Sequence, residues 1–151
     1  MKKIIAVDPG KTTGVAVFLY DGTPQVQSLH ELLQFEFADV VATELASVPQ
    51  GATLEVVCER FVINAQTVKN SQAPFSLEQI GILKYLVHSA GFDADKIHFQ
   101  SPSDAKKLFP NEALKKIGVW HKGGGGHALD AARHGLLRMA KTGWVPRVLL
   151  D

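Results

Sequence analysis

The opening stretch, residues 2–18, constrains the fold more than any other part of the chain. A short apolar run ends in the carboxylate of Asp8, turns through Pro9-Gly10, and restarts as a second apolar run after Gly14. This pattern predicts a β-hairpin with Asp8 at its open end. Burying an ionised carboxylate among apolar neighbours is unfavourable unless a cation or several donors pair with it. Asp8 is therefore either a turn residue that caps its own loop or one member of a charged site.

Two further acidic residues are predicted to reach the same place. Glu59 ends a run rich in β-branched residues, 54–59, which should lie beside the opening strand, and parallel neighbours put their carboxyl ends on one edge of a sheet. Asp130 lies in a predicted helix, 127–139, three residues after His127 and among small alanines that allow close approach to the sheet. The alternatives are that Glu59 is an ordinary strand-end residue and that Asp130 only complements the helix dipole.

The proposed catalytic and metal-binding set is Asp8, Glu59, His127 and Asp130. Three carboxylates packed together repel one another unless divalent cations are present, and oxygen ligands suit Mg²⁺ or Mn²⁺. Two ions about 3.5–4 Å apart could activate a water molecule and stabilise the leaving oxygen of a phosphodiester. These residues therefore predict metal-dependent phosphodiester hydrolysis with two ions.

The remaining pattern predicts an α/β fold, a mixed sheet flanked by helices, in a single domain spanning residues 1–151. A hydrophobic content of 46% and a charged content of 21% are typical of soluble globular proteins. The other expected elements are a short strand at 25–27, helices at 28–45, 76–90 and 101–109, a strand at 96–100, and a mobile polar loop at 64–74. The helix at 76–90 is apolar over more than one stripe, so it is either the contact surface of a homodimer or a buried core helix.

Charge is divided unevenly along the chain. Residues 1–95 contain six Lys and Arg against eleven Asp and Glu, a net charge of −5, whereas residues 96–151 carry +6. The late basic residues are predicted to form one surface facing a polyanion or, alternatively, separate solvated helix faces. Cys58 is the only cysteine, and neither a membrane span nor a signal peptide is recognisable, so we expect a cytoplasmic protein without a membrane partner.

Four motifs taken in order resemble the RuvC family of Holliday-junction resolvases, which have an RNase H-like fold. They are Asp8-Pro9-Gly10 with Thr13-Gly14, Val57-Cys58-Glu59 followed by Phe61, the 102–107 segment with its paired lysines, and His127-x-x-Asp130-Ala131. The overall charge is less basic than in a strong DNA binder. The glycine run 123–126, longer than expected, is either a slack linker or a loop that orders on substrate. The compact chain also resembles a bacteriophage branch, which would act in the host cytoplasm.

The resemblance implies an endonuclease that cleaves Holliday junctions or other branched DNA, such as flaps and forks, with Mg²⁺ or Mn²⁺. We also expect a homodimer, because resolving a four-way junction requires two symmetric nicks. The resemblance further implies that Asp8, Glu59 and Asp130 are metal ligands and that His127 stands where other members have His or Asp. The residues expected to contact DNA are Lys11, Phe61, Lys69, Lys106, Lys107, Lys115, Lys116 and Lys122.

Two other functions fit parts of the sequence. The 8–14 segment is similar to the phosphate loop of actin-like sugar kinases and ATPases, but those proteins need two such domains around the nucleotide. A catalytically silent nucleic-acid-binding module is the second alternative. Such a module would be expected to lack a complete set of acidic residues, and none is missing here.

Overall fold

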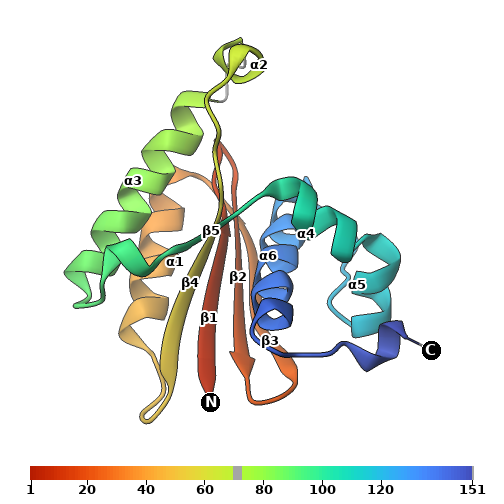
Figure 1. The fold of residues 1–151 in the computed structure, drawn as a ribbon. Helices are drawn as coiled ribbons and strands as arrows, with labels where there is room; N and C mark the ends of the chain where they lie inside the picture. The colour runs from red at the N-terminus through yellow and green to blue at the C-terminus, as the bar shows by residue number, and fades with distance from the viewer. Residues whose placement is uncertain (70–72, 151) are drawn as a thin grey trace.

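A five-stranded mixed sheet forms the centre of the structure (Figure 1), a computed structural model that describes residues 1–69 and 73–150. The strand order is β3-β2-β1-β4-β5. The central strand β1 (Lys2–Asp8) pairs antiparallel with β2 (Thr13–Tyr20), as the predicted hairpin requires, and parallel with β4 (Thr53–Glu59). The edge strands are β3 (Pro24–Leu32), antiparallel to β2, and β5 (His98–Gln100), parallel to β4.

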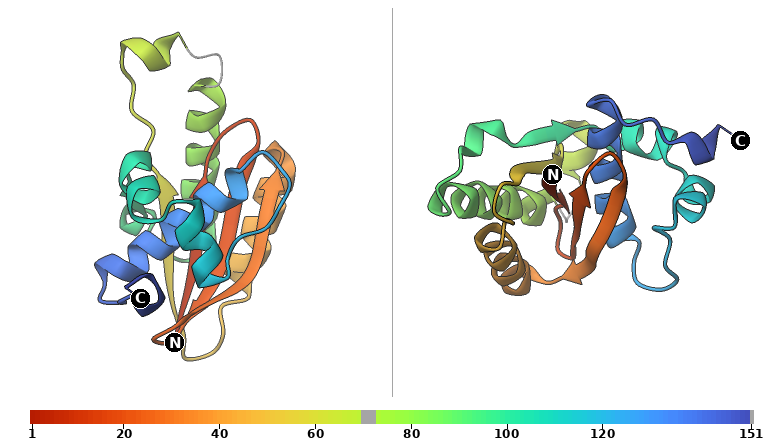
Figure 2. Two further views of the ribbon diagram at one scale, coloured as in Figure 1. Left: turned by 90° about the vertical axis from the view of Figure 1, so that its right-hand side faces the viewer. Right: turned by 90° about the horizontal axis from the view of Figure 1, so that it is seen from below.

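Helices cover both faces of this sheet (Figure 2), and side-chain alternation along the strands explains how. Ile5 and Val7 of β1 face a cluster that includes α1 (Gln34–Ala46) and α3 (Ala73–Ser89). Ile4 and Ala6 face the opposite cluster, which includes α4 (Pro102–Leu108), α5 (Asn111–Ile117) and α6 (His127–Lys141). The predicted α/β class, with a mixed sheet flanked by helices, is therefore confirmed.

Helix α6 packs against the sheet at backbone contact distance. A Cβ atom added at Gly14 of β2 would lie 1.9 Å from the carbonyl oxygen of His127, and one added at Gly135 would lie 2.7 Å from the Phe18 ring. Glycine inside a helix is normally unfavourable, so the absence of a side chain at Gly135 has a packing reason. The close approach predicted for this helix is confirmed, and it determines where the first turn of α6 lies.

The predicted helix at 28–45 is wrong at its start. Residues up to Leu32 continue β3, which pairs with β2 along its length, and α1 begins only at Gln34. The backbone ladder with β2 outweighs the helical spacing of a few leucines. At the true start, the Glu36 carboxylate accepts a hydrogen bond from the Leu33 backbone N–H at 3.1 Å.

Other boundaries differ in smaller ways. The predicted polar loop at 64–74 contains the short helix α2 (Ala65–Val68), capped by Asn64, and α3 begins within it at Ala73; positions 70–72 of this prediction lie outside the described residues. The helix α5 was not predicted, and 3₁₀ turns occupy η1 (Ala94–Lys96) and η2 (Arg147–Leu149). Within the described ranges, no helix combines the length and apolar character needed to cross a membrane.

The outer side of α3 exposes fewer apolar residues than the dimer prediction assumed. Leu83 and Val87 are fully buried, and Ile80 and Leu86 pack against the same cluster. The exposed large apolar side chains of α3 are Leu77 (45% exposed) and Tyr85 (69% exposed). The apolar pattern of α3 therefore serves mainly the core.

Candidate active site

Two of the predicted acidic residues meet at one edge of the sheet. Asp8 ends β1 and Glu59 ends the neighbouring parallel strand β4, and their carboxyl groups are close enough to share a hydrogen bond. The first turn of α6 brings His127 to this edge, with its Nδ1 atom 3.5 Å from the Asp8 Oδ2 atom. The structure thus brings Asp8, Glu59 and His127 together.

Asp130, the fourth residue of the predicted set, is directed towards cations of the chain itself. Its Oδ1 atom accepts a hydrogen bond from Arg133 at 2.8 Å, and its Oδ2 atom lies 3.9 Å from the Lys106 ammonium. Among the described residues, no group of three His, Cys, Asp or Glu side chains is arranged to hold a single metal ion. A shared ion would therefore require the Asp130 carboxylate to turn from Arg133.

The electrostatics of the edge nevertheless suit a cation. Burial, the Glu59 carboxylate and the Asp130 charge together raise the pKa of Asp8 far above its usual range, against a smaller opposing effect of Lys106. Burial would also raise the pKa of Glu59, but hydrogen bonds from His134 and Asp8 hold it below its usual value. Of the two neighbouring carboxyls, Asp8 therefore holds a proton more readily than Glu59 when no cation is bound. Carboxylate oxygens and an imidazole nitrogen are ligand types that suit Mg²⁺ or Mn²⁺, although the described side chains are not yet arranged around one ion.

A buried histidine that the sequence reasoning missed contacts this edge. His134, on α6, places its Nε2 atom 3.2 Å from the Glu59 Oε2 atom. Its Nδ1 atom lies 3.1 Å from the side-chain nitrogen of Gln100, at the end of β5. The spacing of three and four along His127, Asp130 and His134 marks a single helix face, so a signal for His134 was present in the sequence.

Glu31 was also missed, because that part of β3 was predicted to be helical. Its carboxylate accepts hydrogen bonds from the backbone N–H groups of Gly125 (2.9 Å), His127 (2.8 Å) and Ala128 (3.4 Å). Burial would raise the pKa of Glu31, but these donors lower it. Glu31 therefore joins the glycine loop 123–126 to β3 and caps the helix that carries His127 and Asp130.

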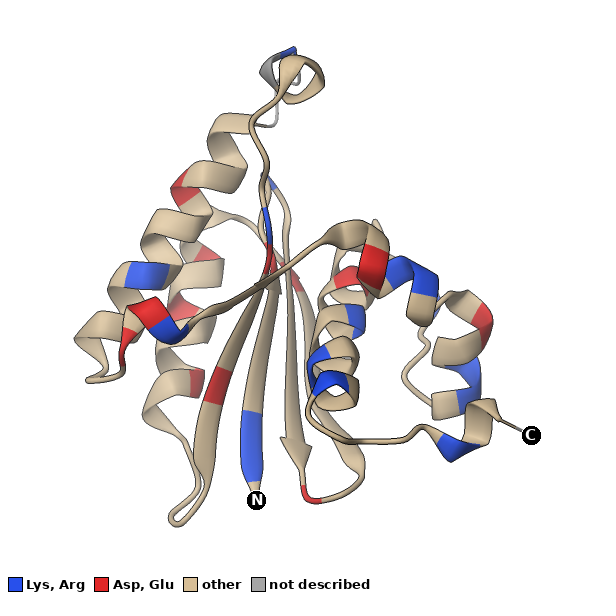
Figure 3. Ribbon diagram, viewed as in Figure 1, with Lys and Arg blue, Asp and Glu red and all other residues tan. Residues whose placement is uncertain are grey.

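Basic residues gather on the side of the sheet covered by α4, α5 and α6, whereas acidic residues are more common around α1 and α3 (Figure 3). Of the predicted DNA contacts, Lys106 lies beside Asp130, and Lys107 is exposed on the same helix. Lys115 lies 3.1 Å from Glu112, and its ammonium is 5.0 Å from the centre of the Trp120 ring.

The other predicted DNA contacts are spread more widely. The Lys11 ammonium lies 5.9 Å from the centre of the Phe75 ring, Lys69 and Lys122 are exposed, and Phe61 is half-buried just after β4. Arg133, counted with the late basic residues, is not a surface residue, because it is buried and donates to Asp130 and to the Phe109 carbonyl.

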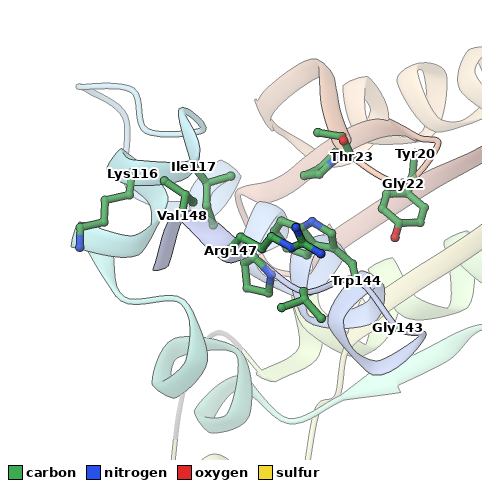
Figure 4. Close-up of a pocket in the computed structure, with 12 residues that line it drawn as sticks. Tyr20, Gly22, Thr23, Lys116, Ile117, Gly143, Trp144, Arg147 and Val148 are labelled. Carbon is green, nitrogen blue, oxygen red and sulfur yellow. The ribbon is translucent and has the colours of Figure 1, made fainter. Parts of the chain in front are cut away.

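Lys116 lies at a cleft away from the carboxylates. This cleft of about 690 Å³ is lined by Tyr20, Trp144 and Arg147 among others (Figure 4). Tyr20 pairs with Lys2 at the end of β1 opposite Asp8, which at 3.3–3.4 Å per residue places the cleft roughly 20 Å from the acidic edge.

No protein-family model and no curated protein matches the chain. Solved structures do match. RuvC of Thermus thermophilus in complex with a Holliday junction substrate superposes with a TM-score of 0.71 and 15% identity, over 95% of this chain and 97% of that chain. Another structure of Thermus thermophilus RuvC gives a TM-score of 0.70 and 16% identity, over 95% and 98%.

A third match comes from a virus. The fowlpox virus resolvase, in complex with substrate Holliday junction DNA, has a TM-score of 0.53 and 15% identity, over 91% of this chain and 99% of that chain. At these identities the likeness concerns the fold, and it extends over nearly the whole chain. The chain therefore has the RNase H-like fold of RuvC, which its motifs predicted.

Proposed function

We propose that this protein is a metal-dependent endonuclease that cleaves Holliday junctions or other branched DNA. The observation that carries the proposal is the meeting of Asp8 and Glu59 at the carboxyl edge of a RuvC-like sheet, with His127 beside them. Two of the matched structures hold Holliday junction DNA, which supports branched DNA as the substrate class.

Asp8, Glu59, His127 and Asp130 would hold the divalent ions. When bound, such ions activate water and stabilise the leaving oxygen of a phosphodiester. The chain itself supplies the framework: β1 and β4 fix the two strand-end carboxylates, and the first turn of α6 adds His127 and Asp130. The exposed Lys106 ammonium, 3.9 Å from Asp130, can pair with a phosphate oxygen brought to this edge.

We assign the DNA-binding surface to the lysines nearest this edge and to the basic helices. The proposed contacts are Lys11, Phe61, Lys69, Lys106, Lys107, Lys115 and Lys122, with Lys116 the least well placed because it borders the distant cleft. Because the lysines would contact phosphates, junction binding should weaken steeply as salt is raised.

We further propose that the protein acts as a homodimer. Resolving a four-way junction requires two symmetric nicks, and a two-fold dimer supplies two sites in one encounter. Leu77 and Tyr85, both exposed on α3, are the apolar residues of that helix that remain available for such a contact. Sedimentation would test this: a monomer at micromolar concentration, both free and on junction DNA, would contradict the dimer.

The activity itself is tested by cleavage of labelled four-way junctions, compared with linear duplex, in Mg²⁺ and in Mn²⁺. Asp8→Asn, Glu59→Gln and Asp130→Asn should retain the fold and junction binding but lose cleavage. Asp39→Asn, at an exposed acid on α1, is the control and should cleave normally. Full cleavage by any site variant would contradict the assignment. ATP turnover, measured alongside, tests the nucleotide-binding alternative.

The role of His127 has a separate readout. A nitrogen ligand suits Mn²⁺ better than Mg²⁺, so cleavage should be faster in Mn²⁺. His127→Ala should reduce cleavage and remove the preference. Equal rates in both metals, together with an unimpaired His127→Ala variant, would exclude His127 from the site.

A further inference from the structure

We propose that His134, held in one tautomer by Gln100, is a positioning residue that fixes the Glu59 carboxylate. This inference rests on the proposed function, in which Glu59 is a site carboxylate. His134 is 1% exposed, and both ring nitrogens have polar partners in the protein interior. An apolar residue could fill the same space, so packing alone does not account for an imidazole here.

The hydrogen-bond geometry determines the tautomer of the ring. The side-chain amide of Gln100 lies 2.9 Å from the backbone carbonyl of His134, which can only accept a hydrogen bond, so the atom facing it must be the Gln100 NH₂ group. The same nitrogen lies 3.1 Å from His134 Nδ1 and cannot accept a proton. Nδ1 is therefore the acceptor, and the ring proton is on Nε2.

This tautomer directs a donor at Glu59. The Nε2–H group faces the Glu59 Oε2 atom at 3.2 Å, so the imidazole donates to the carboxylate. A hydrogen bond from a rigid, buried ring restricts rotation of the carboxyl group. Residues that hydrogen-bond to a metal-binding carboxylate orient it in this way.

Strand pairing puts Gln100 where it can do this. Gln100 is the register partner of Glu59 in the parallel β4–β5 pair, and its carbonyl accepts a hydrogen bond from the Arg60 N–H at 2.7 Å. Its own side-chain oxygen is buried without a hydrogen-bond partner in the described part of the chain. An unpaired buried oxygen destabilises the fold, so the value of Gln100 lies in its donor group. The chain of contacts from Gln100 through His134 to Glu59 thus joins β5, α6 and β4.

The first test is spectroscopic and does not depend on activity. Long-range ¹⁵N–¹H correlation spectra at neutral pH should show His134 as the Nε2–H tautomer. Glu59→Gln should keep that tautomer, because the Gln100 NH₂ group still donates to Nδ1. A wild-type spectrum showing the Nδ1–H form, or loss of the Nε2–H form in Glu59→Gln, would overturn the proposal even if the protein cleaves no DNA.

The second test measures positioning. His134→Leu should slow single-turnover junction cleavage by about 10–100-fold and lower the Mn²⁺ affinity measured by titration. Junction binding should stay within about twofold of wild type. His134→Gln keeps a side-chain N–H donor and should recover part of the rate. Met139→Leu, a buried volume-conserving change on the same helix, is the control and should cleave normally.

The outcomes separate this inference from the proposed function. A wild type that binds Mn²⁺ but cleaves no branched DNA would contradict the function, and the inference would then be judged on the tautomer and on the Mn²⁺ affinity of His134→Leu. An active wild type with an equally active His134→Leu would contradict the inference alone. If His134→Leu fails to fold, Gln100→Leu must slow cleavage for the proposal to stand.

Discussion

Replacing Gly14 with alanine should displace the first turn of α6 from the sheet. The new Cβ atom would lie 1.9 Å from the His127 carbonyl oxygen and 2.3 Å from its carbonyl carbon. Both are backbone atoms, so no change of side-chain rotamer can relieve the contact. An ordinary contact begins near 3.4 Å, so the helix start must retreat by roughly 1.5 Å.

Two effects of different size follow from that displacement. Overpacking a tight contact costs about 3 kcal/mol, the upper part of its usual range, which lowers the Tm of a chain this long by roughly 6–12 °C. Because His127 and Asp130 move with the helix, the cleavage rate of the folded variant should also fall, by about 100-fold for a shift of this size. The loss of activity should therefore persist well below the Tm of the variant.

Thermal denaturation and junction cleavage at 20 °C measure the two effects. Gly81→Ala is the matched control, because Gly81 lies in the interior of α3 with no atom within 4 Å of the added Cβ. That change should stabilise the fold by about 0.5–1 kcal/mol and leave cleavage unchanged. A Gly14→Ala protein with the Tm and cleavage rate of the wild type would refute the argument that backbone contact positions α6.

Three further predictions concern charged groups. Glu31→Ala should lower the Tm and accelerate hydrogen exchange at the amides of the 123–128 segment, since the carboxylate that accepts their hydrogen bonds is gone; unchanged exchange would contradict this. Burial would raise the pKa of Glu55, but Arg138 and Lys2 lower it below its usual value of 4.5. Ionised Glu55 therefore stabilises the fold above pH 4.5, and this stabilisation is lost as the pH falls and the carboxylate is protonated. Glu55→Gln should therefore be less stable than wild type at pH 7 and equal to it once Glu55 is protonated, as urea denaturation at both pH values would show. Asp8→Asn should raise the metal-free Tm, because it removes one of two buried neighbouring carboxyls, and should abolish any rise in Tm that Mn²⁺ produces in the wild type.

The local sequence pattern was sufficient to predict the site residues that lie at the ends of strands. The residues of a strand indicate where it ends, and parallel neighbours place their carboxyl ends at the same edge of a sheet. Asp8 and Glu59 could therefore be expected to lie close together. The small residues of α6 likewise predicted its close approach to the sheet. These inferences needed no knowledge of which side chains meet.

Contacts between segments far apart in the sequence could be identified only from the tertiary structure. The extension of β3 to Leu32 depends on its ladder with β2, and it is this extension that brings Glu31 to the start of α6. Asp130 was expected at the site from its position on the helix, but its carboxylate bonds to Arg133, a partner available on the same face one turn on.

The sequence by itself determined the class of sheet, the edge at which the acidic residues gather and the helix that faces them, because periodicity and the succession of elements can be read along the chain. The tertiary structure alone decided that His134 and Gln100 stand behind Glu59, and that Glu31 holds the glycine loop. Such hydrogen bonds join residues from 34 to 96 positions apart, and their geometry depends on ångström-scale packing that no local pattern encodes.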